Sequence, residues 1–334
     1  MANQKKFDMP LGYKMAAFVA PLPKRGIEEG YKAILNKLRK YSAESIVDVA
    51  LYILWNPPKE KLEEVRSMPW LTLLLVKWAL QDKSVALRVG RSITIADFDQ
   101  LRQQLWDLHG EQERSRDKLN VWLMLRTMVH VQMEFQRDVN WGFLRWPALY
   151  ARLDANSRNR QQFRKVIGME PVEFLDMAFA LYAHMLNGAA DISPDWLGPF
   201  RSIYGDKVDR MYELFVRDLP ALRSELQRDT AQKIRGNQEL YEFPYLRYFP
   251  IVRKRNGRLH VWHRLVLARG LEEAVHLRMS TLEKDYIDSF SRVFEEYVIE
   301  LAVGSGMQAL TEADYKEKVG GHAPNAPNLT PPPL

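Results

Sequence analysis

Apolar side chains recur every three or four residues along most of the first two thirds of the chain, the spacing of helices that bury one face. The pattern predicts helices over residues 27–41, 43–55 and 69–80, with Ser42 capping the second and Pro69 opening the third. Further helices are expected over 97–110, 114–136, 171–187, 206–215 and 221–234. The body is therefore predicted to be a multi-helical assembly.

Residues 250–254 and 258–262 instead alternate apolar and polar side chains, as strands with one buried face do. Between them, Asn256-Gly257 is typical of a type I′ turn, the strongest short-range signal for a β-hairpin. A weaker alternation over 85–95 allows a second, minor hairpin. The fold class expected is mainly α, with one short β-hairpin.

Helical spacing resumes after the hairpin, over residues 265–279 and 290–298, and residues 307–310 are a plausible further strand. The last residues are rich in Pro and Asn, a composition typical of disorder. The organisation expected from these patterns is a loosely ordered N-terminus, a helical body, a basic hairpin with its following helices, and a disordered tail, over 1–25, 26–238, 239–319 and 320–334.

Composition narrows the class of protein. The chain of 334 residues is 46% hydrophobic and 27% charged, as soluble globular proteins are, and it has no cysteine. Disulfides and thiolate metal sites are therefore excluded. The most apolar stretch, 69–80, is too short to span a bilayer and contains Lys77. No secretory leader is recognisable, so we expect a cytoplasmic protein without a membrane partner.

Charge indicates a candidate binding surface. The formal net charge of +6 permits an anionic partner such as DNA or RNA, although a mildly basic solvated surface explains it equally well. Basic side chains concentrate in and after the hairpin. The candidate nucleic-acid- or partner-binding residues are Arg253, Lys254, Arg255, Arg258 and Arg264.

Motifs of common enzymes are missing from the sequence. It contains neither Gly-rich phosphate loop, nor the G-x-S-x-G elbow, nor H-E-x-x-H. His260 and His263 would point to opposite faces of a strand, which argues against a shared metal. A helix–Gly–helix arrangement around Gly168 resembles a helix-turn-helix. Its second helix lacks side chains that read bases, so an ordinary helical hairpin is favoured.

Carboxylates on the helix predicted around 290–298 have two interpretations. Glu296 and Glu300 share a face, and Glu295 is adjacent. In the simpler interpretation these glutamates form the solvated side of an amphipathic helix. In the second, one of them supports a divalent metal in a nuclease core.

Four segments, 243–253, 256–263, 268–278 and 290–298, carry a family resemblance. They read FPYLRYFPIVR, NGRLHVWH, ARGLEEAVHLR and FSRVFEEYV. Together they resemble bacterial anti-phage defence proteins, including the GapS-like group, in which a long helical region leads into a C-terminal PD-(D/E)XK nuclease-like domain. The resemblance implies that residues 239–319 begin an α/β restriction-endonuclease-like domain. It also implies that Glu295 occupies the position of the glutamate on the first helix of the nuclease fold and is a candidate catalytic residue. Glu296, its neighbour, is the weaker candidate.

The chain departs from that family after residue 322. The family would continue into strands bearing an Asp and an acidic-x-Lys motif, whereas this chain runs into Ala-Pro-Asn-Ala-Pro-Asn and stops. We expect a truncated or split member that is inactive alone and has no cofactor. Mg²⁺ would enter only if a protein partner completed the nuclease fold.

Three functions remain open at this point. The leading expectation is a defence-associated helical protein that binds nucleic acid or a partner through its basic hairpin. The alternative is a protein-interaction scaffold in which the aromatic stretch 241–249 packs against the body. The third is an active metal-dependent nuclease. The sequence leaves open the trigger, the oligomeric state, the choice between nucleic acid and protein, and whether Leu334 is the natural end.

Overall fold

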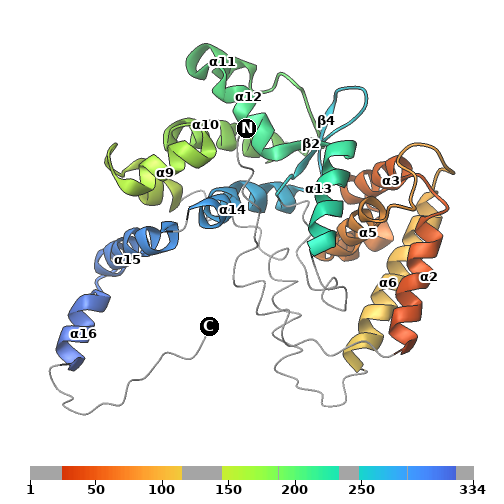
Figure 1. The fold of residues 1–334 in the computed structure, drawn as a ribbon, viewed down its shortest axis with the longest axis horizontal. Coiled ribbons are helices and arrows are strands. Elements are labelled where there is room, and N and C mark those ends of the chain that lie inside the picture. Colours follow the sequence, from red (N-terminus) through yellow and green to blue (C-terminus); the bar gives the residue numbers. More distant parts are fainter. Residues whose placement is uncertain (1–24, 115–144, 187, 233–247, 284, 321–334) are drawn as a thin grey trace.

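The computed structural model describes residues 25–114, 145–186, 188–232, 248–283 and 285–320. Helices predominate and four short strands form one sheet, which confirms the predicted mainly α class with a small β part (Figure 1). The predicted helix 114–136 and the predicted disordered ends lie outside the described residues. So do residues 233–247, and the division predicted at residue 239 therefore stays a prediction.

The first helical group surrounds a core centred on α5, whose apolar side chains are almost all buried. Ser42 caps α3 as predicted, because its hydroxyl accepts a hydrogen bond from the backbone N–H of Ser45 at 3.3 Å. The elements are α2 (Arg25–Leu38), α3 (Ala43–Trp55), η1 (Lys59–Lys61), α4 (Leu62–Ser67), α5 (Pro69–Gln81) and α6 (Ile95–Arg114). The last of these begins and ends further out than the predicted 97–110.

The minor hairpin expected over 85–95 is wrong. Instead, this segment lies along the beginning of α3 and accepts hydrogen bonds from backbone N–H groups there. Ala43 donates to the carbonyl of Ala86 at 2.8 Å and Glu44 donates to that of Leu87 at 3.0 Å. A helix leaves its first N–H groups without partners inside the helix, and the segment satisfies them. Among the described residues, its ladder-type pairing is limited to an isolated bridge between Tyr41 and Arg91.

The second helical group surrounds a separate core rich in aromatic rings. Within it, Trp146 stacks on Phe174, with ring centroids 5.1 Å apart. Gly168, at φ +87°, ends α9 in the left-handed conformation that glycine adopts without strain. The elements are η2 (Pro147–Ala151), α9 (Arg158–Ile167), α10 (Pro171–Leu186), α11 (Gly198–Tyr204) and α12 (Lys207–Phe215).

One small sheet joins the two cores. Its order is β1-β4-β3-β2, with β3 and β4 antiparallel and β2 parallel to β3. Successive residues of a strand point to opposite faces. Val252 and Trp262 accordingly enter the first core, while Ile251 and Val261 enter the second. The strands are β1 (Asp191–Ile192), β2 (Val216–Asp218), β3 (Ile251–Arg253) and β4 (Leu259–Val261).

The predicted hairpin is therefore confirmed, but its turn differs from the expected type I′. The backbone N–H of Lys254 donates to the carbonyl of Arg258 at 2.8 Å, and that of Gly257 donates to the carbonyl of Lys254 at 2.9 Å. Within this loop only Gly257 has a positive φ, +81°. This is a three-residue loop with one left-handed glycine, in which Asn256 keeps a negative φ and its side chain accepts a hydrogen bond from Arg258.

The remaining helices are α13 (Leu219–Gln232), α14 (Arg264–Leu282), α15 (Tyr286–Gly304) and α16 (Glu312–Gly320). α15 and α16 extend away from the rest of the molecule (Figure 1). The strand expected over 307–310 is wrong, because the chain turns there. Gly306 adopts φ +77° and the N–H of Met307 returns to the carbonyl of Ala302 at 2.9 Å, which ends α15.

The aromatic stretch before the hairpin is described only at its end, where Tyr248 and Phe249 are buried in the first core. The guanidinium of Arg217 lies 4.0 Å from the centroid of the Phe249 ring, a cation–π contact. No described helix is long and apolar enough to cross a membrane.

Candidate functional site

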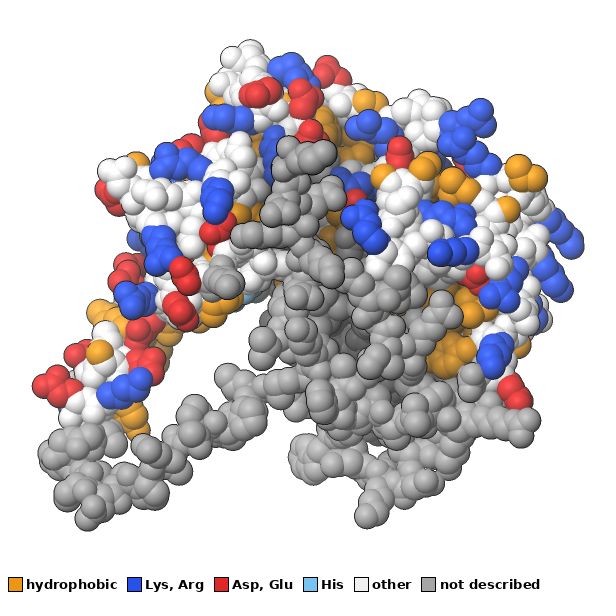
Figure 2. All heavy atoms as spheres, in the orientation of Figure 1, with side chains coloured by type: hydrophobic (Ala, Val, Ile, Leu, Met, Phe, Trp, Pro, Cys, Tyr) orange, Lys and Arg blue, Asp and Glu red, His pale blue; other side chains and the backbone are white. Residues whose placement is uncertain are grey.

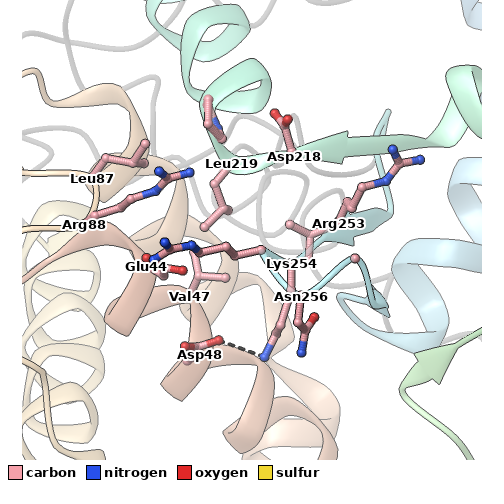
Figure 3. A pocket seen from close by; sticks show the side chains of 14 residues that line it. Glu44, Val47, Asp48, Leu87, Arg88, Asp218, Leu219, Arg253, Lys254 and Asn256 are labelled. Carbon is pink, nitrogen blue, oxygen red and sulfur yellow. Dashed lines mark ion pairs between the residues drawn. The ribbon is translucent and has the colours of Figure 1, made fainter. Parts of the chain in front are cut away.

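A groove of about 800 Å³ lies where the hairpin loop meets the first helical group (Figure 3). One wall of the groove is formed by α3, a second by the loop after α5, and a third by the junction of β2 and α13. The hairpin loop forms the remaining side. Its lining comprises Glu44, Val47, Asp48, Leu87, Arg88, Asp218, Leu219, Pro220, Val252, Arg253, Lys254, Arg255, Asn256 and Gly257.

Two contacts hold the hairpin loop in place over the groove. Lys254 Nζ lies 2.8 Å from Asp48 Oδ1 on α3, an ion pair drawn in Figure 3. On the other side, the parallel pairing of β2 with β3 places Asp218 opposite Arg253. The loop is thus fixed both by a side-chain pair and by the sheet, so its basic residues are presented from a defined position.

Acidic side chains in the groove already have structural partners. Asp48 pairs with Lys254, as described above. Asp218 Oδ1 accepts a hydrogen bond at 2.8 Å from the backbone N–H of Ala221 and so caps α13. Glu44 is in the first turn of α3, where a carboxylate interacts favourably with the helix dipole.

Three arginines of the groove are available to a ligand. Arg88, Arg253 and Arg255 are exposed, and within the described part of the chain none of their side chains forms an ion pair. Leu87, Leu219 and Pro220 supply partly exposed apolar surface to the groove, whereas Val47 and Val252 are buried beneath it. The groove therefore combines unneutralised guanidinium groups with an apolar lining.

The structure separates the five basic residues predicted from the sequence. Arg253, Lys254 and Arg255 line the groove together. Arg258 faces the other edge of the hairpin, where its Nη1 lies 3.4 Å from Asp191 Oδ2 on β1. Arg264 begins α14, at the end of β4 that is remote from the loop.

The two histidines near the hairpin have structural partners of their own. His260 Nδ1 lies 2.6 Å from Asp191 Oδ1, and burial followed by the charge of Lys254 lowers the pKa of His260. His263 is buried and its Nδ1 accepts a hydrogen bond from the N–H of Leu265, capping α14. Burial lowers the pKa of His263 to about 3, so this imidazole is neutral at physiological pH.

The glutamates singled out by the resemblance do not form a metal centre within the described residues. Glu295 accepts a hydrogen bond from the backbone N–H of Glu312, at the beginning of α16, and Glu296 is exposed. No described group of three or more His, Cys, Asp or Glu residues is arranged to hold a metal ion. The described residues around Glu295 and Glu296 therefore do not by themselves provide the set of Mg²⁺ ligands that the resemblance implies.

Sequence reasoning missed the contributions of Asp48 and Arg88. Both belong to the first helical group and meet the hairpin only through the tertiary fold. The one local signal was the sequence Arg88-Val89-Gly90-Arg91, a basic loop between two helices, which could have indicated a second basic surface.

Comparison with known proteins adds no assignment: no family model, curated protein or solved structure matches the chain.

Proposed function

We propose that the groove binds the phosphate backbone of DNA or RNA, and that the protein acts by binding. The observation that carries the proposal is the set of three exposed arginines around one groove, none of them ion-paired among the described residues. A guanidinium group presents several donors in a plane and matches the oxygens of a phosphate. Successive phosphates of a strand could thus be contacted from Arg88, Arg253 and Arg255.

The surroundings of these arginines support a ligand that is extended and negatively charged. Because Asp48 is paired with Lys254, its carboxylate offers less repulsion to an approaching phosphate. None of the described residues that line the groove is an aromatic on which a base could stack. We therefore expect contacts to the backbone, with little dependence on nucleotide sequence.

The biological setting is also a proposal and rests on the resemblance of residues 243–298 to the GapS-like group. It places the protein in the cytoplasm, as a component of anti-phage defence.

Binding can be tested with fluorescein-labelled single-stranded DNA, double-stranded DNA and single-stranded RNA by fluorescence polarisation. Measurements at about 50 and about 200 mM salt report the number of phosphate contacts, because each releases counterions. The variant R88Q/R253Q/R255Q should lose three such contacts. Its plot of log affinity against log salt should then be shallower by about 2–3.

A matched control replaces three exposed arginines elsewhere. Arg152, Arg158 and Arg201 pair with Glu300, Asp285 and Asp209, outside the groove. The variant R152Q/R158Q/R201Q changes the net charge equally and should bind like the wild type. Binding that both triple variants weaken alike would refute the groove as the site.

A second candidate function is the protein-interaction scaffold, and the apolar lining of the groove favours it. Leu87, Leu219 and Pro220, which are partly or fully exposed in the groove, could contact apolar side chains of a peptide. A contact of that kind depends weakly on salt, whereas phosphate contacts depend on it steeply. No binding of any of the three nucleic acids, even at low salt, would leave this second function standing.

A further inference from the structure

The apolar surface of α15 is only partly used by the fold. One stripe of the helix packs against the second core and consists of Phe290, Val293 and Tyr297. The neighbouring stripe is exposed: Phe294 is 41%, Val298 45% and Leu301 53% accessible to solvent. This second stripe is what a partner could cover.

The spacing of the exposed stripe suits a helix as its partner. Ile287, Phe294, Val298 and Leu301 follow one another at intervals of seven, four and three residues, so they lie on one side of α15. They extend over four turns, about 21 Å at 1.5 Å per residue. An amphipathic helix presents apolar anchors over the same length and with the same spacing.

Charge decides what kind of helix fits. α15 carries four carboxylates, Asp288, Glu295, Glu296 and Glu300, and one arginine, Arg292. Glu300 pairs with Arg152, and the other three carboxylates still exceed the single arginine of the helix. This excess is opposite in sign to the net charge of the whole chain, +6. Figure 2 shows acidic, apolar and some basic side chains interspersed along α15 and α16. A second copy of α15 would bring the same negative excess, while a basic helix would meet complementary charge.

We propose that Ile287, Phe294, Val298 and Leu301 form a docking surface for a basic amphipathic helix of a protein partner. Asp288 and Glu295 follow Ile287 and Phe294 by one position, so they border the stripe on its solvent side. They would attract lysines or arginines flanking the apolar face of the partner. The surface is independent of the groove, because α15 and α3 lie on opposite sides of the molecule (Figure 1).

The proposal can be tested with a fluorescein-labelled Lys/Leu peptide that forms one amphipathic helix, titrated with the full chain by fluorescence anisotropy. We expect V298Q/L301Q to bind the peptide about tenfold or more weakly, because two apolar contacts are lost. The control is V172Q/F179Q on α10, where the replaced side chains are 47% and 62% exposed. It should bind like the wild type.

A second pair of measurements examines charge. D288N/E295Q should weaken binding several-fold at low salt and less at high salt. The glutamine keeps an oxygen that can accept the N–H of Glu312, so the junction with α16 is preserved. A Glu/Leu peptide of the same pattern should bind more weakly than the Lys/Leu peptide.

Three results would overturn the proposal. The first is equal binding of the Lys/Leu peptide by the wild type and by V298Q/L301Q. The second is equal binding of the Glu/Leu and Lys/Leu peptides by the wild type. The third is a dimer in sedimentation experiments that V298Q/L301Q abolishes, because the stripe would then be covered by a second copy.

Discussion

The ammonium group of Lys254 lies 2.8 Å from the carboxylate of Asp48, and this pair joins the hairpin loop to α3 in the lining of the groove. The pair has two effects. It fixes the loop, and it neutralises a carboxylate that would otherwise repel phosphate. Exposed pairs of this kind contribute less than about 1 kcal/mol to stability, so their effect on ligand binding can be studied in a folded protein.

Replacing Asp48 with Asn should strengthen nucleic-acid binding. The change removes a negative charge from the groove and releases Lys254 to contact a phosphate. We expect affinity to increase several-fold at about 50 mM salt, together with a steeper salt dependence. Fluorescence polarisation measures both. D209N, which removes a carboxylate from the exposed Arg201–Asp209 pair, is the control for net charge. Equal effects of D48N and D209N would contradict the prediction.

Replacing Arg223 with Met should destabilise the fold. Its Nη2 donates to the backbone carbonyls of Asp82, Lys83 and Val85, at 3.1, 3.3 and 2.8 Å. These hydrogen bonds supply donors to the carbonyl groups just after the end of α5. Loss of these charge-assisted bonds should lower the free energy of unfolding by about 1–3 kcal/mol in urea titrations. R228M, at an exposed position of the same helix, should change it little. Similar losses in both variants would show that the carbonyl contacts are unimportant.

Replacing Tyr286 with Phe should also lower the free energy of unfolding. The buried hydroxyl of Tyr286 lies 2.6 Å from that of Tyr150 and 3.0 Å from Nδ1 of His276, so its removal leaves two polar groups without that partner. An unsatisfied buried group costs about 1–3 kcal/mol. Urea unfolding measures the loss, and Y315F, on the exposed face of α16, is the matched control. A change no larger than that of Y315F would contradict the prediction.

Stability should fall on acidification partly because of His263. In the unfolded chain this histidine takes up a proton near pH 6.5, whereas burial lowers its pKa in the folded protein to about 3. Between these values the unfolded state binds more protons, so the free energy of unfolding decreases as pH falls, by about 1 kcal/mol per unit from this group. H263N retains a capping side chain and does not titrate.

Urea unfolding of the wild type and of H263N at pH 7, 6 and 5 separates this contribution from that of other groups. Burial also lowers the pKa values of His260 and His276, so both proteins should lose stability with acid. The wild type should lose more, and the difference should grow below pH 6.5. Parallel pH profiles would exclude His263 as the cause.

Local signals in the sequence were sufficient for α3 and α5 and for the hairpin. Ser42 and Pro69 mark the beginnings of α3 and α5 because capping and proline geometry act within one turn of the helix. The type of turn at Asn256-Gly257 was harder to predict. A two-residue loop and a three-residue loop differ only in the register of the flanking strands, which the tertiary fold decides.

Features that depend on distant residues were not predictable. β1 and β2 contain two and three residues, and they are strands only because β4 and β3 pair with them. The segment 85–95 has an alternating pattern, but its carbonyl groups accept hydrogen bonds from the first N–H groups of α3 and so do not pair in a hairpin. The groove required Asp48 and Arg88 from the first helical group, so the sequence indicated its hairpin side alone.

The two strands of the hairpin have one face in each core, with Val252 and Trp262 on one side and Ile251 and Val261 on the other. Loss of the hairpin would expose apolar surface of both helical groups at once. The groups should therefore melt together, in one cooperative transition, although each has a core of its own. A change that destabilises the hairpin should therefore destabilise both helical groups. A ligand that binds the folded hairpin loop should likewise raise the melting temperature of the whole molecule.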